Sequence, residues 1–223
     1  MNQEIWTAVD QYINQTLVSA DPVLGAALQD SEKAGLPSIQ VSPSQGKMLH
    51  ILAKSINARN ILEIGTLGGY STIWMARALP AGGHLLTLEA DAKHAEVARA
   101  NVARAGLAEI VELRLGPALN TLPHVATEGR GPFDLIFIDA NKSTMAEYFD
   151  WSLKLSRPGT MIIADNVIRS GAVIDAGSED ADVQGVRRFN ARVAAEPRVS
   201  ATEVQTVGSK GYDGFALVLV LAS

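Results

Sequence analysis

The sequence lacks cysteine altogether, although it is 223 residues long. This absence excludes disulfides, thiolate metal sites and cysteine nucleophiles, so a bound metal ion would need oxygen or imidazole ligands. The sequence also lacks any apolar run of about 18 residues, and its N-terminus lacks the charged and apolar parts of a signal peptide. We therefore expect a cytoplasmic protein that has no membrane partner.

Basic residues are outnumbered by acidic ones, 19 against 24, and the net charge of −5 argues against a nucleic-acid partner bound through its phosphates. Linkers, internal repeats and low-complexity segments are absent as well. With 47% hydrophobic residues, the chain is long enough to bury one full core. We expect a single domain over residues 1–223, with N-terminal helices in 1–57 and a cofactor-binding core in 58–223.

The order of the predicted elements indicates the class of fold. Apolar side chains at intervals of three and four predict N-terminal helices at 5–17, 22–34 and 44–56. Short apolar runs then predict strands at 60–64, 84–88, 110–114, 134–139 and 160–164, with helices between them at 71–79, 91–105, 117–122 and 144–156. A last helix at 184–195 precedes two strands, 201–207 and 214–221. This pattern predicts an α/β fold with a doubly wound, mostly parallel seven-stranded sheet, helices on both faces and a C-terminal antiparallel hairpin.

The stretch from Ile61 to Thr72 consists of an apolar run, a glycine-rich turn and the start of a helix. This order opens nucleotide-binding units, in which glycines let the backbone approach a ligand closely, although some tight turns without a ligand share it. The glycines follow Glu63-x-Gly65-x-x-Gly68-Gly69 instead of the dinucleotide pattern G-x-G-x-x-G. The carboxylate of Glu63 would repel a pyrophosphate but could hold an ammonium group, which favours S-adenosylmethionine over a nicotinamide cofactor.

Acidic residues end several of the predicted strands. Glu89 lies about 20 residues after the glycines, where a ribose-binding carboxylate is expected. Asp139 and Asp165 end strands that should be neighbours, so their carboxylates would lie roughly 5 Å apart and repel each other unless a cation lies between them. A divalent cation with Asn166 as a third ligand satisfies this requirement, magnesium first and manganese or calcium as alternatives. Lys142 follows Asp139 closely enough to act as a base beside that metal.

Each of these residues also has a simpler interpretation. Asp165 and Asn166 could form a turn that caps a helix, as such residues often do. Lys142 could be a solvated loop lysine. The occurrence of Asp139 and Asp165 at matching strand ends favours the metal site.

Taken together, these motifs resemble the cation-dependent, S-adenosylmethionine-dependent O-methyltransferases that include catechol and caffeoyl-CoA O-methyltransferases. The likeness runs in the family's order from about residue 38 to the end of the chain. The matching segments are Leu62–Ser71, Leu88–Asp91, Gly116–Leu119, Phe137–Lys142, Ala164–Val167 and Gly211–Ala216.

The resemblance implies a Rossmann-like methyltransferase fold, a homodimer, and a small phenolic substrate of the catechol type. It implies that Glu63 and Ser71 hold the methionine part of S-adenosylmethionine, that Glu89 binds the ribose and that Ala118 lies against the adenine. The implied cofactor-binding set is Val41, Glu63, Gly65, Thr66, Ser71, Glu89, Ala118, Asp139 and Asn141. The implied metal ligands are Asp139, Asp165 and Asn166. The implied catalytic residues are Lys142, as the base, and Asp139.

The sequence says less about the acceptor. A larger natural-product hydroxyl is an alternative acceptor to a catechol. A protein that binds S-adenosylmethionine without catalysis is a second alternative, although the predicted metal ligands and base argue against it. We expect specificity to come from the loops at 35–44, 168–183 and 210–213. The acidic residues Glu179, Asp180 and Asp182 disfavour a strongly anionic substrate such as a coenzyme A thioester. Asn141 departs from plant members of the family, which often carry aspartate there.

Overall fold

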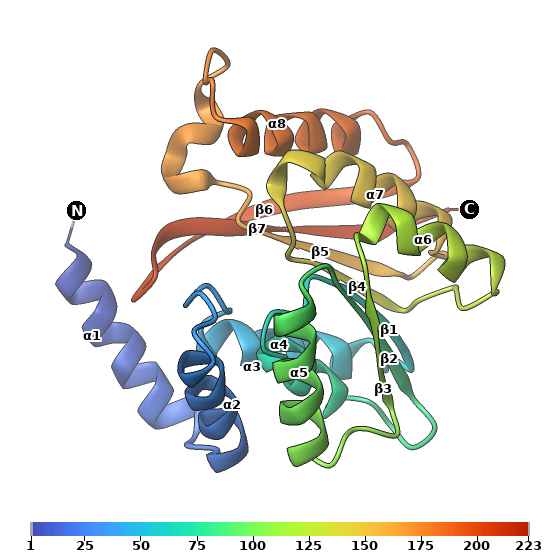
Figure 1. The fold of residues 1–223 in the computed structure, drawn as a ribbon. Coiled ribbons are helices and arrows are strands. Elements are labelled where there is room, and N and C mark those ends of the chain that lie inside the picture. The colour runs from blue at the N-terminus through green and yellow to red at the C-terminus, as the bar shows by residue number, and fades with distance from the viewer. Residues whose placement is uncertain (1, 223) are drawn as a thin grey trace.

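A seven-stranded sheet in the order β3-β2-β1-β4-β5-β7-β6 forms the centre of the computed structural model, which describes residues 2–222 (Figure 1). Five strands run parallel: β1 (Asn60–Ile64), β2 (His84–Glu89), β3 (Val111–Leu115), β4 (Leu135–Ile138) and β5 (Met161–Asp165). The long strands β6 (Val199–Gly208) and β7 (Gly211–Val220) form a hairpin, and β7 runs antiparallel to β5. The predicted, mostly parallel sheet with a C-terminal antiparallel hairpin is confirmed.

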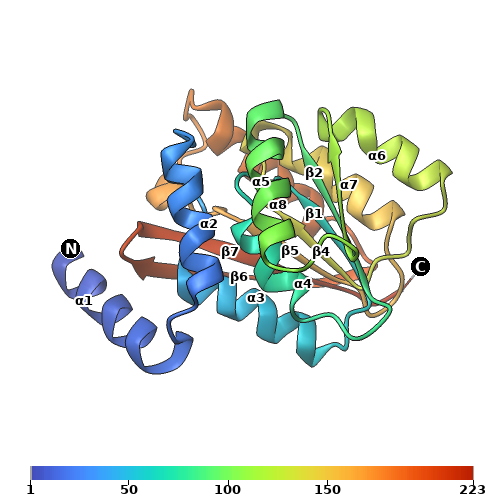
Figure 2. The same ribbon diagram turned by 60° about the horizontal axis from the view of Figure 1, so that its bottom comes forward.

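Helices cover both faces of this sheet (Figure 1, Figure 2). One face carries α6 (Ala118–Thr127), α7 (Met145–Lys154) and α8 (Ala181–Ala194). The other face carries α3 (Pro43–Ser55), α4 (Tyr70–Ala76) and α5 (Ala92–Arg104), with α2 (Pro22–Lys33) packed against α4 and α5. Each face has its own apolar core. Phe149 and Phe189 pack edge to face in the first, with ring centroids 5.6 Å apart, and Ile73 and Met75 are fully buried in the second.

The first helix, α1 (Gln3–Ile13), continues as a π-helical turn over Asn14–Val18 and lies beside the tip of the β6–β7 hairpin (Figure 2). The Gln3 side chain donates a hydrogen bond of 2.8 Å to the Gly208 carbonyl. The Ser209 N–H donates one of 2.7 Å to the Asp10 carboxylate. The N-terminal helix is thereby tied to a hairpin formed near the other end of the chain.

The strand order reverses between β1 and β4, because the chain moves outward through β2 and β3 before it returns to β4. At such a reversal, the connections leave on opposite faces and open a crevice beyond the carboxyl ends of the strands. Ile64 pairs with Ile138, and Ile138 pairs in turn with Ala164. The residues that follow, Asp139 and Asp165 among them, therefore share one edge of the sheet.

Some helical boundaries differ from the expectation. The helix predicted at 117–122 continues to Thr127 despite Pro123, because the buried Leu122 holds it against the sheet. Two short 3-10 segments, which the sequence did not predict, lie at Lys142–Thr144 and Arg169–Ile174. Within residues 2–222, none of the helices has the length and apolar content needed to cross a membrane.

Helix α8 packs directly on the segment that carries Lys142. A Cβ atom added at Gly185 would lie 2.1 Å from the Lys142 carbonyl oxygen and 2.6 Å from Ser143 Cα. Such distances are closer than any real Cβ contact, so the approach depends on glycine at this position. Gly185 thus allows the lysine-bearing segment to lie against the helix.

Two glycine-to-alanine changes test this packing. Gly185→Ala is expected to lower the free energy of unfolding by about 1–3 kcal/mol, because the new methyl group collides with backbone. An added Cβ at Gly25, inside α2, would have no atom within 4 Å. Gly25→Ala should therefore raise the free energy of unfolding by up to about 1 kcal/mol, because alanine has the higher helix propensity. Urea unfolding followed by circular dichroism measures both. Equal stabilisation by the two changes would contradict the close approach of α8.

Candidate active site

Two adjoining cavities open at the edge where the parallel strands end. The larger, about 750 Å³, lies above the ends of β1, β2 and β4, and we call it the inner cavity. The smaller, about 490 Å³, lies between the loop at 38–42, the end of β5 and the β6–β7 hairpin, and we call it the outer cavity. The two share the lining residues Ile39, Gln40, Val41, Asn166 and Arg169. One molecule in each cavity would therefore be in position to meet the other.

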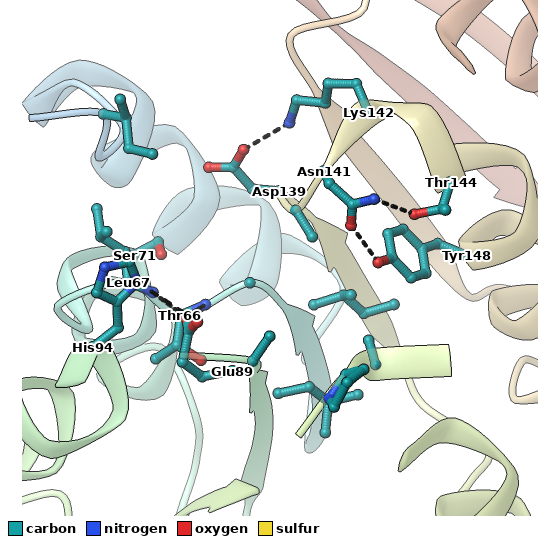
Figure 3. Close-up of a pocket in the computed structure, with 18 of the residues that line it drawn as sticks. Thr66, Leu67, Ser71, Glu89, His94, Asp139, Asn141, Lys142, Thr144 and Tyr148 are labelled. Atoms are coloured by element: carbon teal, nitrogen blue, oxygen red, sulfur yellow. Dashed lines mark hydrogen bonds and ion pairs between the residues drawn. The ribbon is translucent and has the colours of Figure 1, made fainter. Parts of the chain in front are cut away.

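The glycine turn after β1 forms the floor of the inner cavity. Gly65 has a φ of 99°, and a Cβ there would lie 2.1 Å from the Asp139 carbonyl oxygen, so no other residue fits. The Glu89 carboxylate accepts hydrogen bonds from the backbone N–H groups of Thr66 at 3.1 Å and Leu67 at 2.8 Å (Figure 3). It also accepts one from Asp91 N–H at 2.9 Å. Glu89 thus fixes the turn and still lines the cavity, where its remaining lone pairs can accept ligand hydroxyls.

Glu63 lies beneath this floor and does not line either cavity. Its side chain is fully buried and accepts hydrogen bonds from Ser71 at 2.6 Å, Thr72 at 2.5 Å and Thr87 at 2.7 Å. Burial raises the pKa of Glu63 to about 7. The inner cavity is lined by Ser71, one of these three donors, and not by Glu63 itself. The role of Glu63 as a cofactor ligand stays a prediction.

Asp139 and Lys142 form an ion pair at the end of β4. The Lys142 ammonium lies 2.9 Å from Asp139 Oδ1, and the Lys142 residue is only 6% exposed (Figure 3). Lys142 is therefore not the solvated loop lysine of the simpler interpretation. Asn141, between the two, turns toward α7: it accepts a hydrogen bond from the Tyr148 hydroxyl at 2.5 Å and donates one to Thr144 at 2.7 Å. This network fixes the segment that carries the lysine.

Asp165 and Asn166 follow β5, and they bring further oxygen atoms to the same edge. Asp165 is 5% exposed and accepts a hydrogen bond of 3.2 Å from Gln45 of α3. Burial, and then the negative charge of Asp139, raise the pKa of Asp165 to about 7. Asn166 has a left-handed φ of 60°. The 3-10 segment that follows has no side-chain cap, which argues against the simpler reading of these residues as a helix cap.

These donors fit a hard divalent cation. Asp165 is buried and feels the negative charge of Asp139, so the two carboxylates repel each other when both are ionised. A metal ion would relieve that repulsion. Carboxylate and amide oxygens are the ligands that magnesium, manganese and calcium accept. Within residues 2–222 no group of three or more His, Cys, Asp or Glu side chains forms a metal site, so this donor set depends on the Asn166 amide.

Most residues that the sequence placed at the site do line the cavities. The inner cavity is lined by Val41, Gly65, Thr66, Ser71, Glu89, Ala118, Asp139, Asn141, Lys142 and Asn166. Asp165 lines the outer cavity. The sequence did not point to His94, Tyr148 or Gln45, which also line these cavities, and it named Lys210 only as part of the loop at 210–213. His94 Nδ1 lies 3.6 Å from the Glu89 carboxylate. Its position in the first turn of α5, just after the end of β2, could have identified it as a cavity residue from the sequence.

Comparison with known proteins gives consistent matches. A family model described as O-methyltransferase matches residues 15–220. The catechol O-methyltransferase of Niastella koreensis is 56% identical over 220 residues, which span 99% of this chain and 100% of that protein. The O-methyltransferase from Bacillus cereus, solved in complex with SAH, is 58% identical with a TM-score of 0.97, over 98% of this chain and 99% of that one. The O-methyltransferase TomG from Streptomyces achromogenes, involved in tomaymycin synthesis and solved with SAM, is 51% identical with a TM-score of 0.96 over the whole of both chains.

Glu63→Gln should change how stability depends on pH. The folded pKa of Glu63, about 7, lies above the ordinary value of 4.5, so the unfolded chain releases this proton first as the pH rises. The contribution of Glu63 to the free energy of unfolding is therefore fully present below about pH 4.5. It falls by on the order of 3 kcal/mol as the pH rises from there to about 7. Urea unfolding of both proteins from about pH 5 to 8 tests this. The wild type should lose stability relative to the variant as the pH rises, and parallel profiles would contradict the assignment.

Proposed function

Because this chain belongs to the O-methyltransferase family, we propose that it transfers the methyl group of S-adenosylmethionine to a hydroxyl of a catechol-type small molecule, with a divalent cation as cofactor. One observation carries the proposal. At the ends of the neighbouring strands β4 and β5, Asp139, the buried Lys142 and Asn166 line the inner cavity, and Asp165 and Asn166 line the adjoining outer cavity.

The inner cavity supports the cofactor part of the proposal. Its volume, about 750 Å³, lies in the range of small-molecule sites. Glu89 would accept hydrogen bonds from the ribose hydroxyls, and Ala118, at the start of α6, would pack against the adenine. The backbone at Val41 and Gly65, with the Ser71 hydroxyl, would hold the methionine part. Glu63 would act through Ser71, whose hydroxyl it orients.

The strand-end donors support the metal part of the proposal. Asp139, Asp165 and Asn166 would hold the cation, with Gln45 keeping the Asp165 carboxylate in place. When bound, a divalent cation would lower the pKa of an acceptor hydroxyl and favour the neutral form of a neighbouring lysine. The outer cavity would admit the acceptor, because Asp165 and Asn166 both line it.

Lys142 would remove the proton from the acceptor hydroxyl. Its ammonium nitrogen is buried at the wall of the inner cavity and is fixed by Asp139. Once deprotonated, the acceptor oxygen would take the methyl group while the bond between that carbon and the sulfonium sulfur breaks, so a neutral thioether would leave. Lys142 would hold the released proton at Nζ. The remaining contribution of the chain is to place the two molecules in adjoining cavities.

A larger natural-product hydroxyl is a second acceptor class that the structure accommodates. The two cavities share five lining residues, and the outer one extends to the hairpin and to α1. A relative of similar length is involved in tomaymycin synthesis. Binding of the cofactor without catalysis is disfavoured, because it would leave the buried Lys142 at the cavity wall with no role beyond its ion pair with Asp139.

We also propose that the chain forms a homodimer. Helix α1 exposes the apolar side chains of Ile5, Val9 and Tyr12 by 56%, 48% and 67%, and Leu17 follows at 71%. Exposed apolar groups that gather on one element are typical of a protein interface. Sedimentation of the purified chain at the mass of a single copy would contradict this assembly.

Methyl transfer from labelled S-adenosylmethionine to catechol, with magnesium and with excess chelator, tests the reaction. We expect transfer that the chelator abolishes. Asp165→Ala should abolish it as well, while calorimetry shows cofactor affinity within a few-fold of wild type, because Asp165 lines only the outer cavity. Glu109→Ala, which removes an exposed carboxylate away from both cavities, is the matched control and should retain activity. Full activity of Asp165→Ala would refute the metal assignment.

Lys142→Ala is expected to lower kcat by about a hundredfold or more, the usual contribution of a general base, with a much smaller effect on cofactor affinity. Lys142→Arg separates catalysis from packing. Arginine can keep the ion pair with Asp139 but cannot give up its proton at neutral pH. Steady-state kinetics should therefore show both variants to be slow. Recovery of kcat in Lys142→Arg would reduce Lys142 to a structural partner of Asp139.

A further inference from the structure

Three backbone N–H groups hold the Glu89 carboxylate at the wall of the inner cavity. Its Oε2 accepts the N–H groups of Thr66 and Leu67, whereas its Oε1 accepts that of Asp91. Each oxygen of an ionised carboxylate has about two positions at which it can accept a hydrogen bond. The acceptor capacity that remains for a ligand is therefore on Oε1.

His94 lies beside this same oxygen atom. Its Nδ1 is 3.6 Å from Glu89 Oε1, and both side chains line the inner cavity (Figure 3). A separation of 3.6 Å is too long for a hydrogen bond, so the two groups do not satisfy each other. Because Nδ1 faces a carboxylate, the tautomer with the proton on Nδ1 is favoured. His94 thus places a donor next to the open acceptor of Glu89.

The position of His94 relative to Glu89 is fixed by a single residue. Asp91 donates its N–H to Glu89 Oε1 at 2.9 Å, and its carboxylate accepts the His94 N–H at 3.0 Å. Asp91 is the N-cap of α5, so the first turn of this helix is anchored on the residue that ends β2. The His94 side chain is 24% exposed, which leaves it accessible to a ligand in the cavity.

A ribose hydroxyl needs both kinds of partner. It donates one hydrogen bond and can also accept, whereas a carboxylate can only accept. Glu89 alone would take the hydroxyl proton and leave the hydroxyl oxygen without a donor, because the neighbouring backbone N–H groups already point at Glu89. A polar atom that is removed from water without a partner costs free energy. Glu89 and His94 together match a hydroxyl on both counts.

We propose that His94 is a specificity-determining residue for the ribose of S-adenosylmethionine. Its Nδ1–H donates to the oxygen of one ribose hydroxyl, and that hydroxyl donates its own proton to Glu89 Oε1. The inference rests on the place of the cofactor under the proposed function. His94 takes no part in methyl or proton transfer, so it acts on the affinity for the cofactor and not on the chemical step.

Calorimetry with S-adenosylhomocysteine, and with its 2′-deoxy and 3′-deoxy analogues, tests this role. His94→Phe keeps an aromatic ring but removes the donor. It should weaken the binding of S-adenosylhomocysteine by about fivefold, the usual contribution of one hydrogen bond. The same variant should bind one of the two deoxy analogues as tightly as the wild type does, because that analogue lacks the hydroxyl that His94 contacts.

A conservative variant and a kinetic measurement separate this role from packing. In His94→Asn the amide Nδ2 can take the position of the imidazole Nδ1, so most of the affinity should return. Steady-state methylation of catechol by His94→Phe should show a KM for S-adenosylmethionine that is raised by about fivefold and a kcat within about twofold of wild type. His124→Phe, which replaces an exposed histidine of α6 away from both cavities, is the matched control and should change neither value.

The outcomes distinguish this inference from the proposed function. Unchanged affinity of His94→Phe for S-adenosylhomocysteine, or equal weakening of all three ligands, would overturn the inference alone. Failure of the wild-type protein to bind S-adenosylhomocysteine would overturn the proposed cofactor site, and the inference with it. The expected binding pattern without methylation of any catechol would support the role of His94 and overturn the proposed acceptor.

Discussion

The close approach of Gly65 to the Asp139 carbonyl is the constraint on which the site depends. It brings the turn after β1 against the end of β4, at the point where the strand order reverses. A side chain at Gly65 would push these two segments apart. Their separation would move Asp139, and with it Lys142, away from the inner cavity. One missing Cβ therefore sets the distance between the proposed cofactor site and the proposed base.

Around this contact the fold keeps carboxyl groups in places where their charge is unfavourable. Burial raises the pKa of both Glu63 and Asp165 to about 7, but the two are satisfied differently. Glu63 is surrounded by hydroxyl donors and has no need of a ligand. Asp165 receives one amide hydrogen bond and faces a second carboxylate. The difference in donors separates a structural acid from one suited to a cation, although their pKa values are alike.

The sequence predicted the sheet and most of the cavity lining, because strand ends in a parallel sheet fall on one edge whatever the details of packing. It could not predict the depth of Glu63, which depends on hydroxyls contributed by α4 and β2. The sequence also could not predict the role of Gln45, because its hydrogen bond to Asp165 joins residues that lie 120 positions apart in the chain. Lys210 was expected only as part of a loop. Its ammonium donates to the Gln40 carbonyl across 170 residues of chain, a contact that no local pattern encodes.

The tie between α1 and the hairpin has a consequence for how this enzyme can diversify. The inner cavity is built mainly from the middle of the chain, whereas the outer cavity draws on the two ends, which meet through Gln3 and Gly208. Substitutions in either terminal region can change the outer cavity, where we propose that the acceptor binds, without disturbing the glycine turn or Glu89. The proposed donor site and the proposed acceptor site therefore draw on different parts of the chain, and one can change while the other is preserved.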